Sequence, residues 1–158
     1  AVAHELTPSL TLLGQFNFVR WQVFDELRVE LEDPAVEDLV KPQNYGNAIS
    51  VAVGAEWEAT QRWTLRSGLQ WDESPVDDAL RDTRVPDGDR FWAAVGLSYL
   101  VSERVQLDLS YAHIFIESVE VDLDTPVFEG TIVETSVNTR AEVDSSADLL
   151  ALRLHLRF

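Results

Sequence analysis

The sequence predicts an all-β fold: an antiparallel up-and-down sheet that forms the wall of a transmembrane β-barrel. Three observations predict it. Apolar and polar residues alternate with a period of two in six segments, short and long connections between these segments alternate strictly, and aromatic residues gather near the segment ends. A soluble β-sandwich shows the same alternation, because one face of each strand then packs on a core, so it stays the alternative.

Six segments are expected to be strands, because each has one apolar face. In the closing segment Leu150, Leu152 and Leu154 alternate with Ala151 and Arg153, whereas helical periodicity is weak along the whole chain. In chain order the apolar faces are Leu10, Leu12, Phe16 and Phe18; Ile49, Val51, Val53, Ala55 and Trp57; Trp63, Leu65, Leu69 and Trp71; Phe91, Ala93, Val95, Leu97 and Tyr99; Val105, Leu107, Leu109 and Tyr111; and Leu150, Leu152, Leu154, Leu156 and Phe158.

The connections between these segments differ in length and charge. Thr60-Gln61-Arg62 and Ser102-Glu103-Arg104 are short enough for tight turns, whereas residues 26–43, 73–89 and 122–145 are long and acidic. Outer-membrane barrels have short periplasmic turns and longer external loops. With the C-terminus in the periplasm, every long connection falls outside and every tight turn inside.

Aromatic residues fall near both ends of the expected strands, where amphipathic rings meet the two membrane interfaces. The rings expected at the periplasmic interface are Trp57, Trp63, Tyr99 and Phe158, and those expected at the outer interface are Trp71, Phe91 and Tyr111. In a β-sandwich the same rings would lie in the core, so the pattern favours the barrel without excluding the alternative.

Composition excludes several classes of protein. The 158 residues suffice for one domain, and the absence of cysteine excludes disulfides and thiol chemistry. A net charge of −16, from 28 acidic and 12 basic residues, argues against nucleic acid as a partner. No apolar run is long enough for a transmembrane helix. The opening "AVAHELTPSL" lacks the pattern of a signal peptide, so we expect a mature product or a piece of a longer protein.

An ordered series of residues in the middle of the chain carries a family resemblance. The stretch "RWTLRSGLQWDESPVDDALRDTRVPDGDRFWAAVGLSYLVSERVQLDLSYAHIF" resembles the C-terminal part of the FadL/TodX (OMPP1) family of outer-membrane transport proteins. The matching elements are Trp63-Thr64-Leu65-Arg66, Gly68, Asp72, Ser74-Pro75-Val76, Arg81 or Arg84, Pro86-Asp87, Asp89-Arg90, Trp92, Gly96, Tyr99, Asp108, Tyr111, Ala112 and His113.

The resemblance implies a monomeric fourteen-stranded barrel in the outer membrane of a Gram-negative bacterium, with an N-terminal hatch. Such proteins take up long-chain fatty acids or other hydrophobic compounds passively, so we expect neither enzyme activity nor a cofactor. Because six strands do not readily close around a useful lumen, residues 1–158 are expected to form the C-terminal part of such a barrel. Expected partners are a hydrophobic small molecule, outer-membrane lipid and lipopolysaccharide, and the barrel-assembly machinery, which reads a terminal aromatic such as Phe158.

The candidate ligand path combines charged residues of the expected strands and of the 73–89 connection. A guanidinium in this connection is suited to meet a ligand carboxylate, although ion pairs that only hold the loop closed would have the same composition. Cross-strand pairs such as Asp108 with Arg153 are expected to brace the wall. The candidate residues are Arg66, Asp72, Arg81, Arg84, Arg90 and Arg153.

Metal binding and catalysis find little support in the sequence. Asp87 and Asp89 have calcium-like spacing but lack the rest of a binding loop, so no metal is expected. His113 has the parity opposite to Ser110 and Asp108, and no acid or nucleophile is expected beside it, so we expect no catalytic residue.

Overall fold

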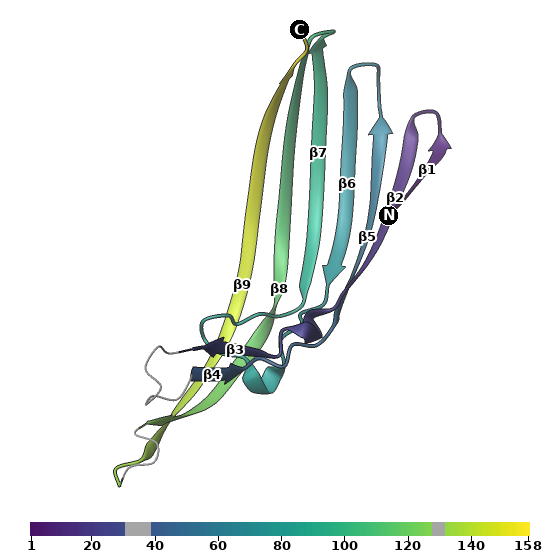
Figure 1. The fold of residues 1–158 in the computed structure, drawn as a ribbon. Coiled ribbons are helices and arrows are strands. Elements are labelled where there is room, and N and C mark those ends of the chain that lie inside the picture. The colour runs from purple at the N-terminus through teal and green to yellow at the C-terminus, as the bar shows by residue number, and fades with distance from the viewer. Residues whose placement is uncertain (31–38, 128–131) are drawn as a thin grey trace.

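The computed structural model describes residues 1–30, 39–127 and 132–158. Seven strands form one sheet in the order β1-β2-β5-β6-β7-β8-β9, each antiparallel to its neighbour, and β3 and β4 form a separate hairpin (Figure 1). The strands are β1 (Val2–Thr7), β2 (Leu10–Val19), β3 (Glu26–Val29), β4 (Leu39–Pro42), β5 (Ala48–Glu58), β6 (Trp63–Asp72), β7 (Arg90–Ser102), β8 (Val105–Val127) and β9 (Thr135–Leu156), and the short 3-10 helices are η1 (Trp21–Val23) and η2 (Asp78–Leu80).

The register brings the predicted apolar residues of neighbouring strands onto one face of the sheet. Val51 pairs with Trp71, Trp71 with Phe91, and Phe91 with Phe115. Ser50 pairs with Asp72, and Asp72 with Arg90, on the other face. The alternation therefore predicted the faces of the wall correctly, and we call them the apolar face and the polar face.

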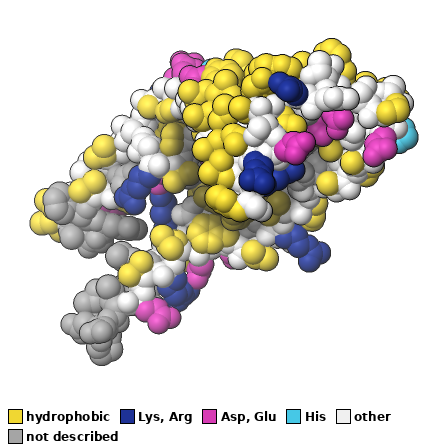
Figure 2. Space-filling model, turned by 90° about the horizontal axis from the view of Figure 1, so that it is seen from above, with side chains coloured by type: hydrophobic (Ala, Val, Ile, Leu, Met, Phe, Trp, Pro, Cys, Tyr) yellow, Lys and Arg dark blue, Asp and Glu magenta, His cyan; other side chains and the backbone are white. Residues whose placement is uncertain are grey.

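The apolar face has no second layer of described residues packed on it. Leu152 and Leu150 are 75% and 77% exposed, and Val95 and Leu154 are also exposed. Hydrophobic side chains cover much of the surface when the molecule is seen from the end at which β9 finishes (Figure 2). A soluble sandwich would bury these side chains, because monomeric soluble proteins rarely expose a large continuous apolar patch. The β-sandwich alternative is therefore not favoured.

The prediction of six strands was wrong, because Val2–Thr7 adds a seventh strand to the sheet. His4 interrupts the apolar side of this short strand, so the alternation of the strand is weak. The strand still pairs with β2, and His4 lies opposite Leu12. The β3–β4 hairpin was likewise expected to be loop. Each of its strands has four residues, too few for a clear period of two.

The expected long connection 122–145 is mostly strand. β8 and β9 run on as a two-stranded ribbon that projects past the other strands (Figure 1). Polar cross-strand bonds accompany the ribbon: Asp122 accepts a bond from Nη2 of Arg140 at 2.7 Å and one from Asn138 at 3.0 Å. Val121 and Leu123 do alternate with Asp122 and Asp124 here, but the acidic composition of residues 122–145 favoured a loop in the prediction.

Aromatic rings form two rows across the wall. The rings of Trp63 and Tyr99 stack with 4.2 Å between their centroids, and those of Phe91 and Phe115 lie 6.2 Å apart near the other end. Tyr111, expected in the second row, lies midway between Leu107, which pairs with Tyr99, and Phe115. Its place in the outer row was therefore predicted wrongly, since Phe115 occupies that position.

The short and long connections lie at opposite ends of the wall (Figure 1). Residues 59–62 form a tight turn in which Oγ1 of Thr60 accepts bonds from the backbone N–H groups of Arg62 and Trp63 at 3.2 and 3.1 Å. The β3–β4 hairpin and η2 lie at the other end. None of the described helices is long and apolar enough to span a membrane.

Candidate functional site

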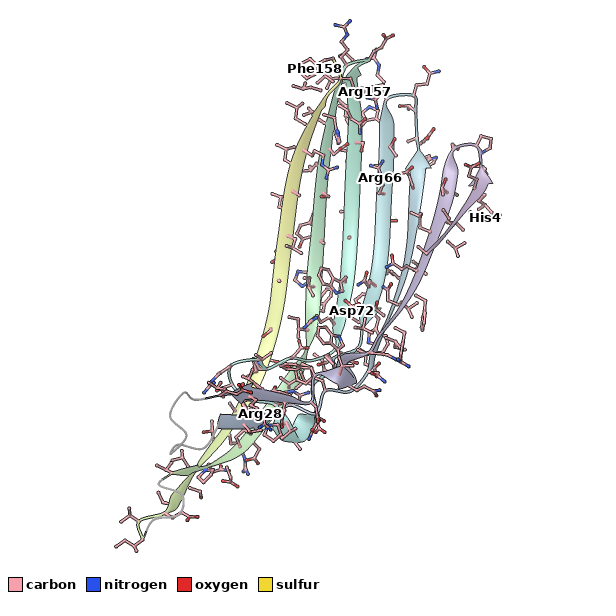
Figure 3. All side chains as sticks on the ribbon, in the orientation of Figure 1. His4, Arg28, Arg66, Asp72, Arg157 and Phe158 are labelled. Carbon is pink, nitrogen blue, oxygen red and sulfur yellow. The ribbon has the colours of Figure 1, made fainter. Side chains whose placement is uncertain are left out.

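A cavity of about 320 Å³ lies at the end of the polar face, beneath the long connections. The row Ser50–Asp72–Arg90, contributed by β5, β6 and β7, provides its polar wall. Trp21 and Tyr45, from the segment between β2 and β5, line it too. We call it the loop-side cavity. Asp72 lies at the loop end of β6, and Arg66 lies nearer the turn end of the same strand (Figure 3).

The 73–89 connection covers this cavity and is held by its own charged groups. The buried guanidinium of Arg81 donates to the carbonyl oxygen of Asp87 at 2.9 Å and to Oδ1 of Asp78 at 2.7 Å. The carboxylate of Asp87 accepts from Oγ of Ser74 at 3.0 Å and pairs with Arg90. Arg81 therefore stabilises the loop, and it does not line the loop-side cavity.

The loop is also fixed to its neighbours. The backbone N–H of Glu117 in β8 donates to the carbonyl oxygen of Asp89 at 2.8 Å, and the backbone N–H of Ser74 donates to Oδ1 of Asp89 at the same distance. A Cβ atom on Gly88 would come within 2.7 Å of Cγ1 of Val119 and 2.8 Å of the carbonyl oxygen of Glu117. Only glycine allows this close approach of loop and strand.

An ion pair joins the β3–β4 hairpin to the same loop. Nζ of Lys41 pairs with the carboxylate of Asp82, and this bond lowers the pKa of Asp82 below its ordinary value. A second cavity of about 230 Å³ lies beside the pair, lined by Tyr45 and Arg84 among others. The ring of Tyr45 lies edge-on to Phe24, with 5.1 Å between centroids, so aromatic packing positions this segment as well.

A second set of charges lies on the polar face toward the turn end. Nε of Arg66 lies 2.5 Å from Oε2 of Glu56, and its Nη1 donates to Oγ of Ser98 at 2.5 Å. The carboxylate of Asp108 accepts from Gln106 at 2.7 Å and lies 2.9 Å from Nε2 of His155. These side chains brace neighbouring strands in the region where the predicted pairs were expected.

One predicted pair in this set was wrong, and the partner of Arg66 was not predicted. Arg66 pairs with Glu56 of the adjacent strand, because Glu56 is directly opposite it in the register. Arg153 is directly opposite Asp108, but His155 takes that carboxylate. Within the described ranges, Arg153 forms no ion pair. It lines a hollow of about 490 Å³, the turn-side hollow, together with Arg66.

The six candidate residues are thus divided among four places. Asp72 and Arg90 meet in the loop-side cavity, Arg66 and Arg153 line the turn-side hollow, Arg84 lines the second cavity, and Arg81 stabilises the loop. Sequence reasoning missed Trp21, Tyr45 and Glu73 as cavity residues. Trp21 and Tyr45 are separated from the strands by loop, so no periodicity marked them.

No acidic residue was expected beside His113, but Asp148 lies next to it. Its Nδ1 lies 2.7 Å from Oδ1 of Asp148, and the hydroxyl of Tyr111 donates to the same oxygen at 2.6 Å. The three side chains lie on the apolar face, away from Ser110 and Asp108. Asp87 and Asp89 were considered in the sequence as calcium ligands. The described residues contain no group of three or more potential metal-ligating side chains.

Comparison with known proteins agrees with this geometry. All 158 residues match the family described as outer membrane protein transport protein (OMPP1/FadL/TodX). Outer membrane protein P1 of Haemophilus influenzae is 27% identical over 98% of this chain and 33% of its own length, and the long-chain fatty acid transport protein of Escherichia coli K12 is 29% identical over 80% and 28%.

A solved structure shows the same likeness in three dimensions. The crystal structure of a Pseudomonas aeruginosa FadL homologue superposes with a TM-score of 0.79 at 25% identity, covering 98% of this chain and 34% of that one. The chain therefore spans about a third or less of the length of these proteins. The family consists of outer-membrane transport proteins and not enzymes, which confirms the predicted class and location. With its antiparallel wall and exposed apolar face, the chain belongs to the OMPP1/FadL/TodX family.

Proposed function

We propose that this chain serves the passive passage of hydrophobic small molecules across the outer membrane, as part of a barrel wall and its entrance. The loop-side cavity is the observation that carries the proposal. It opens on the polar face, at the end with the long connections, yet Val19, Val76 and Val85 give it apolar walls. An apolar pocket with a few converging polar groups is the usual form of a small-molecule site.

The two faces of the wall support this function in different ways. The exposed apolar side chains suit contact with hydrocarbon, where each backbone group has to be paired within the barrel. In the described part of the chain β1 and β9 each have one strand partner. We therefore propose that residues 1–158 form the C-terminal part of a larger barrel and that further strands pair with these two edges.

The proposed path begins at Asp72 and Arg90 in the loop-side cavity and continues past Arg66 and Arg153 in the turn-side hollow. Arg84 stands beside the entrance, and Arg81 holds the loop that shapes it. Since Arg66, Arg81 and Arg90 already bond to acidic groups, the path presents few cations to an incoming molecule. The apolar walls of the loop-side cavity then favour the carbon-rich part of a molecule, which moves down its concentration gradient without an energy source.

Two partner proposals follow from exposed groups, and one proposal concerns the oligomeric state. The acidic residues of the loops and the β8–β9 ribbon are suited to bridge lipopolysaccharide through divalent cations, and EDTA treatment of the assembled protein tests this. Phe158 is fully exposed at the turn end of the wall, available to the barrel-assembly machinery (Figure 3). We expect Phe158→Ala to reduce the amount of assembled barrel. A monomer is expected in detergent.

Uptake by cells that lack the protein, complemented with the full-length form, tests the function. We expect Val85→Trp to reduce the uptake rate of a hydrophobic probe severalfold, because the indole fills the loop-side cavity. Val53→Trp, on the exposed apolar face, is the matched control and is expected to leave uptake unchanged. Equal uptake by Val85→Trp, Val53→Trp and the unmodified protein would contradict the proposed entrance.

A further inference from the structure

We propose that the loop-side cavity prefers a hydrophobic ammonium compound to a hydrophobic carboxylate of the same chain length. The inference rests on the proposed function and names the class of molecule that the entrance favours. It starts from the cavity's charge: Asp72, Glu73 and Asp87 line it, and Arg90 is the cation among the lining residues.

Arg90 is already neutralised. Its guanidinium pairs with the carboxylate of Asp87, which also accepts a bond from Oγ of Ser74 at 3.0 Å. An incoming carboxylate would have to compete with Asp87 for Arg90 while lying close to two further carboxylates. Like charges at such separations repel one another, more strongly where water is partly excluded.

Asp72 and Glu73 remain without a cation. Asp72 accepts two bonds from Nε2 of Gln70, at 2.8 and 3.0 Å, and Glu73 accepts one from the backbone N–H of Ile49 at 3.0 Å. Over residues 1–30, 39–127 and 132–158, neither carboxylate forms an ion pair. Both are partly buried, so their charges are screened less than those of fully exposed groups. They leave the cavity with a net negative charge.

The neighbouring cavity does not reverse this balance. Its lysine, Lys41, is paired with Asp82, and Arg84 lines that second cavity but not the loop-side cavity. The closest guanidinium on the cavity wall is therefore the paired one, Arg90.

Aromatic rings supply the second half of the argument. Trp21 and Tyr45 both line the loop-side cavity, with 6.4 Å between their ring centroids and an edge-on arrangement. Faces of indole and phenol rings attract organic cations, and quaternary ammonium groups are often recognised by such rings together with carboxylates. Val19, Val76 and Val85 offer the adjacent apolar surface for the alkyl chain. The cavity volume of about 320 Å³ fits a head group and the start of a chain.

Competition binding to the purified full-length protein tests the proposal. An alkyltrimethylammonium, an alkanoate and an alkanol of equal chain length, each below its micellar concentration, are compared for displacement of an uncharged fluorescent probe. We expect the ammonium compound to bind about tenfold tighter than the alkanoate, with the alkanol between them. Asp72→Asn/Glu73→Gln should remove most of this preference and change alkanol binding much less than ammonium binding. Glu103→Gln, in a turn at the opposite end, should change neither.

The outcomes separate this inference from the proposed function. If the alkanoate binds as tightly as the ammonium compound, or if Asp72→Asn/Glu73→Gln keeps the full preference, the charge preference is wrong while alkanol binding still supports a hydrophobic entrance. If none of the three displaces the probe and Val85→Trp does not reduce uptake, the proposed entrance itself is wrong. Trp21→Leu should weaken ammonium binding severalfold more than alkanol binding, and equal losses would contradict the aromatic contribution.

Discussion

His113 and Asp148 face each other across β8 and β9 on the apolar face of the wall, with 2.7 Å between Nδ1 and Oδ1. Ionisable residues are costly on the lipid-facing side of a barrel. Here the cost is reduced because the Tyr111 hydroxyl donates to the same carboxylate at 2.6 Å and the His113 ring packs edge-on against Phe115. We call Tyr111, His113 and Asp148 the membrane-side cluster.

Asp148→Ala removes the acceptor of the membrane-side cluster. We expect the free energy of unfolding to fall, because Tyr111 and His113 lose the acceptor that they share. The triple variant Tyr111→Phe/His113→Leu/Asp148→Leu should recover most of the loss, since no polar group is left unpaired. Urea unfolding in lipid vesicles measures both, with Leu150→Ala on the same face as control. A triple variant less stable than Asp148→Ala would contradict the hydrogen-bond explanation.

The polar face offers a comparable test at Arg66. Arg66→Met removes the donor that Glu56 and the buried Ser98 share, so we expect a loss of about 1 kcal/mol in unfolding free energy. Glu56→Gln/Arg66→Gln should recover part of it, because two amides replace the charges and still bond across the strands. The midpoint of urea unfolding gives the comparison. If Arg66→Met and the double variant unfold at the same midpoint as the unmodified protein, the network does not brace the wall.

The alternation of apolar and polar side chains made the two faces of each strand predictable. Val95 has the same parity as Leu97 in β7, and Leu152 has the same parity as Leu154 in β9. Both pairs lie on the apolar face, because a strand repeats every two residues. Contacts between strands were not predictable in the same way. Arg66 meets Glu56 because the register places them opposite, and a sequence without its register does not show this pairing.

The candidate site was predictable only where a strand carries it. Asp72 was expected on the polar face and Arg90 in the loop that follows β6, and the two residues line the loop-side cavity together. Trp21 and Tyr45 reach the same cavity through the fold of a connection, which depends on contacts such as the bond from the Gly46 backbone N–H to the carbonyl oxygen of Pro75 at 2.8 Å. Such contacts between two loops leave no periodic signal.

The Lys41–Asp82 pair predicts a response to acid outside the membrane-spanning part of the wall. The bond from Lys41 lowers the pKa of Asp82, so the stabilisation is present above the ordinary value of 3.8 and is lost as the pH falls through the lowered pKa. We expect the β3–β4 hairpin to stay protected from protease at neutral and mildly acidic pH and to become accessible only in stronger acid. Cleavage of the hairpin by acid-stable proteases, measured by mass spectrometry over a range of pH, tests this expectation.

Lys41→Gln removes the charge that lowers the pKa of Asp82. In this variant the hairpin should be cleaved faster at neutral pH as well, and the acid-dependent step should shrink. Lys41→Arg should keep the step, because the ion pair remains possible. Equal cleavage profiles for Lys41→Gln and the unmodified protein would show that the pair does not hold the hairpin.

Gly88 and Gly46 lie in connecting segments at the same end of the wall, but they differ in the space that a methyl group would meet. A Cβ atom at Gly88 would lie 2.7 Å from Cγ1 of Val119 and 2.8 Å from the carbonyl oxygen of Glu117, whereas at Gly46 the nearest atom is the carbonyl oxygen of Pro75 at 3.8 Å. We therefore expect Gly88→Ala to lower the unfolding free energy by about 1–3 kcal/mol, and Gly46→Ala to change it little.

Combining Gly88→Ala with Val119→Ala should separate the two contacts that Gly88 allows, one with the Val119 side chain and one with the Glu117 carbonyl oxygen. Val119→Ala removes the side-chain clash but not the clash with the Glu117 backbone, so the double variant Gly88→Ala/Val119→Ala should stay less stable than Val119→Ala alone. Because the loop also covers the loop-side cavity, Gly88→Ala should displace Val85 and change the binding of an uncharged hydrophobic probe, whereas Gly46→Ala should not. A Gly88→Ala protein with unchanged unfolding and unchanged probe binding would mean that the loop tolerates a shift away from β8 and that this close approach does not position the cavity.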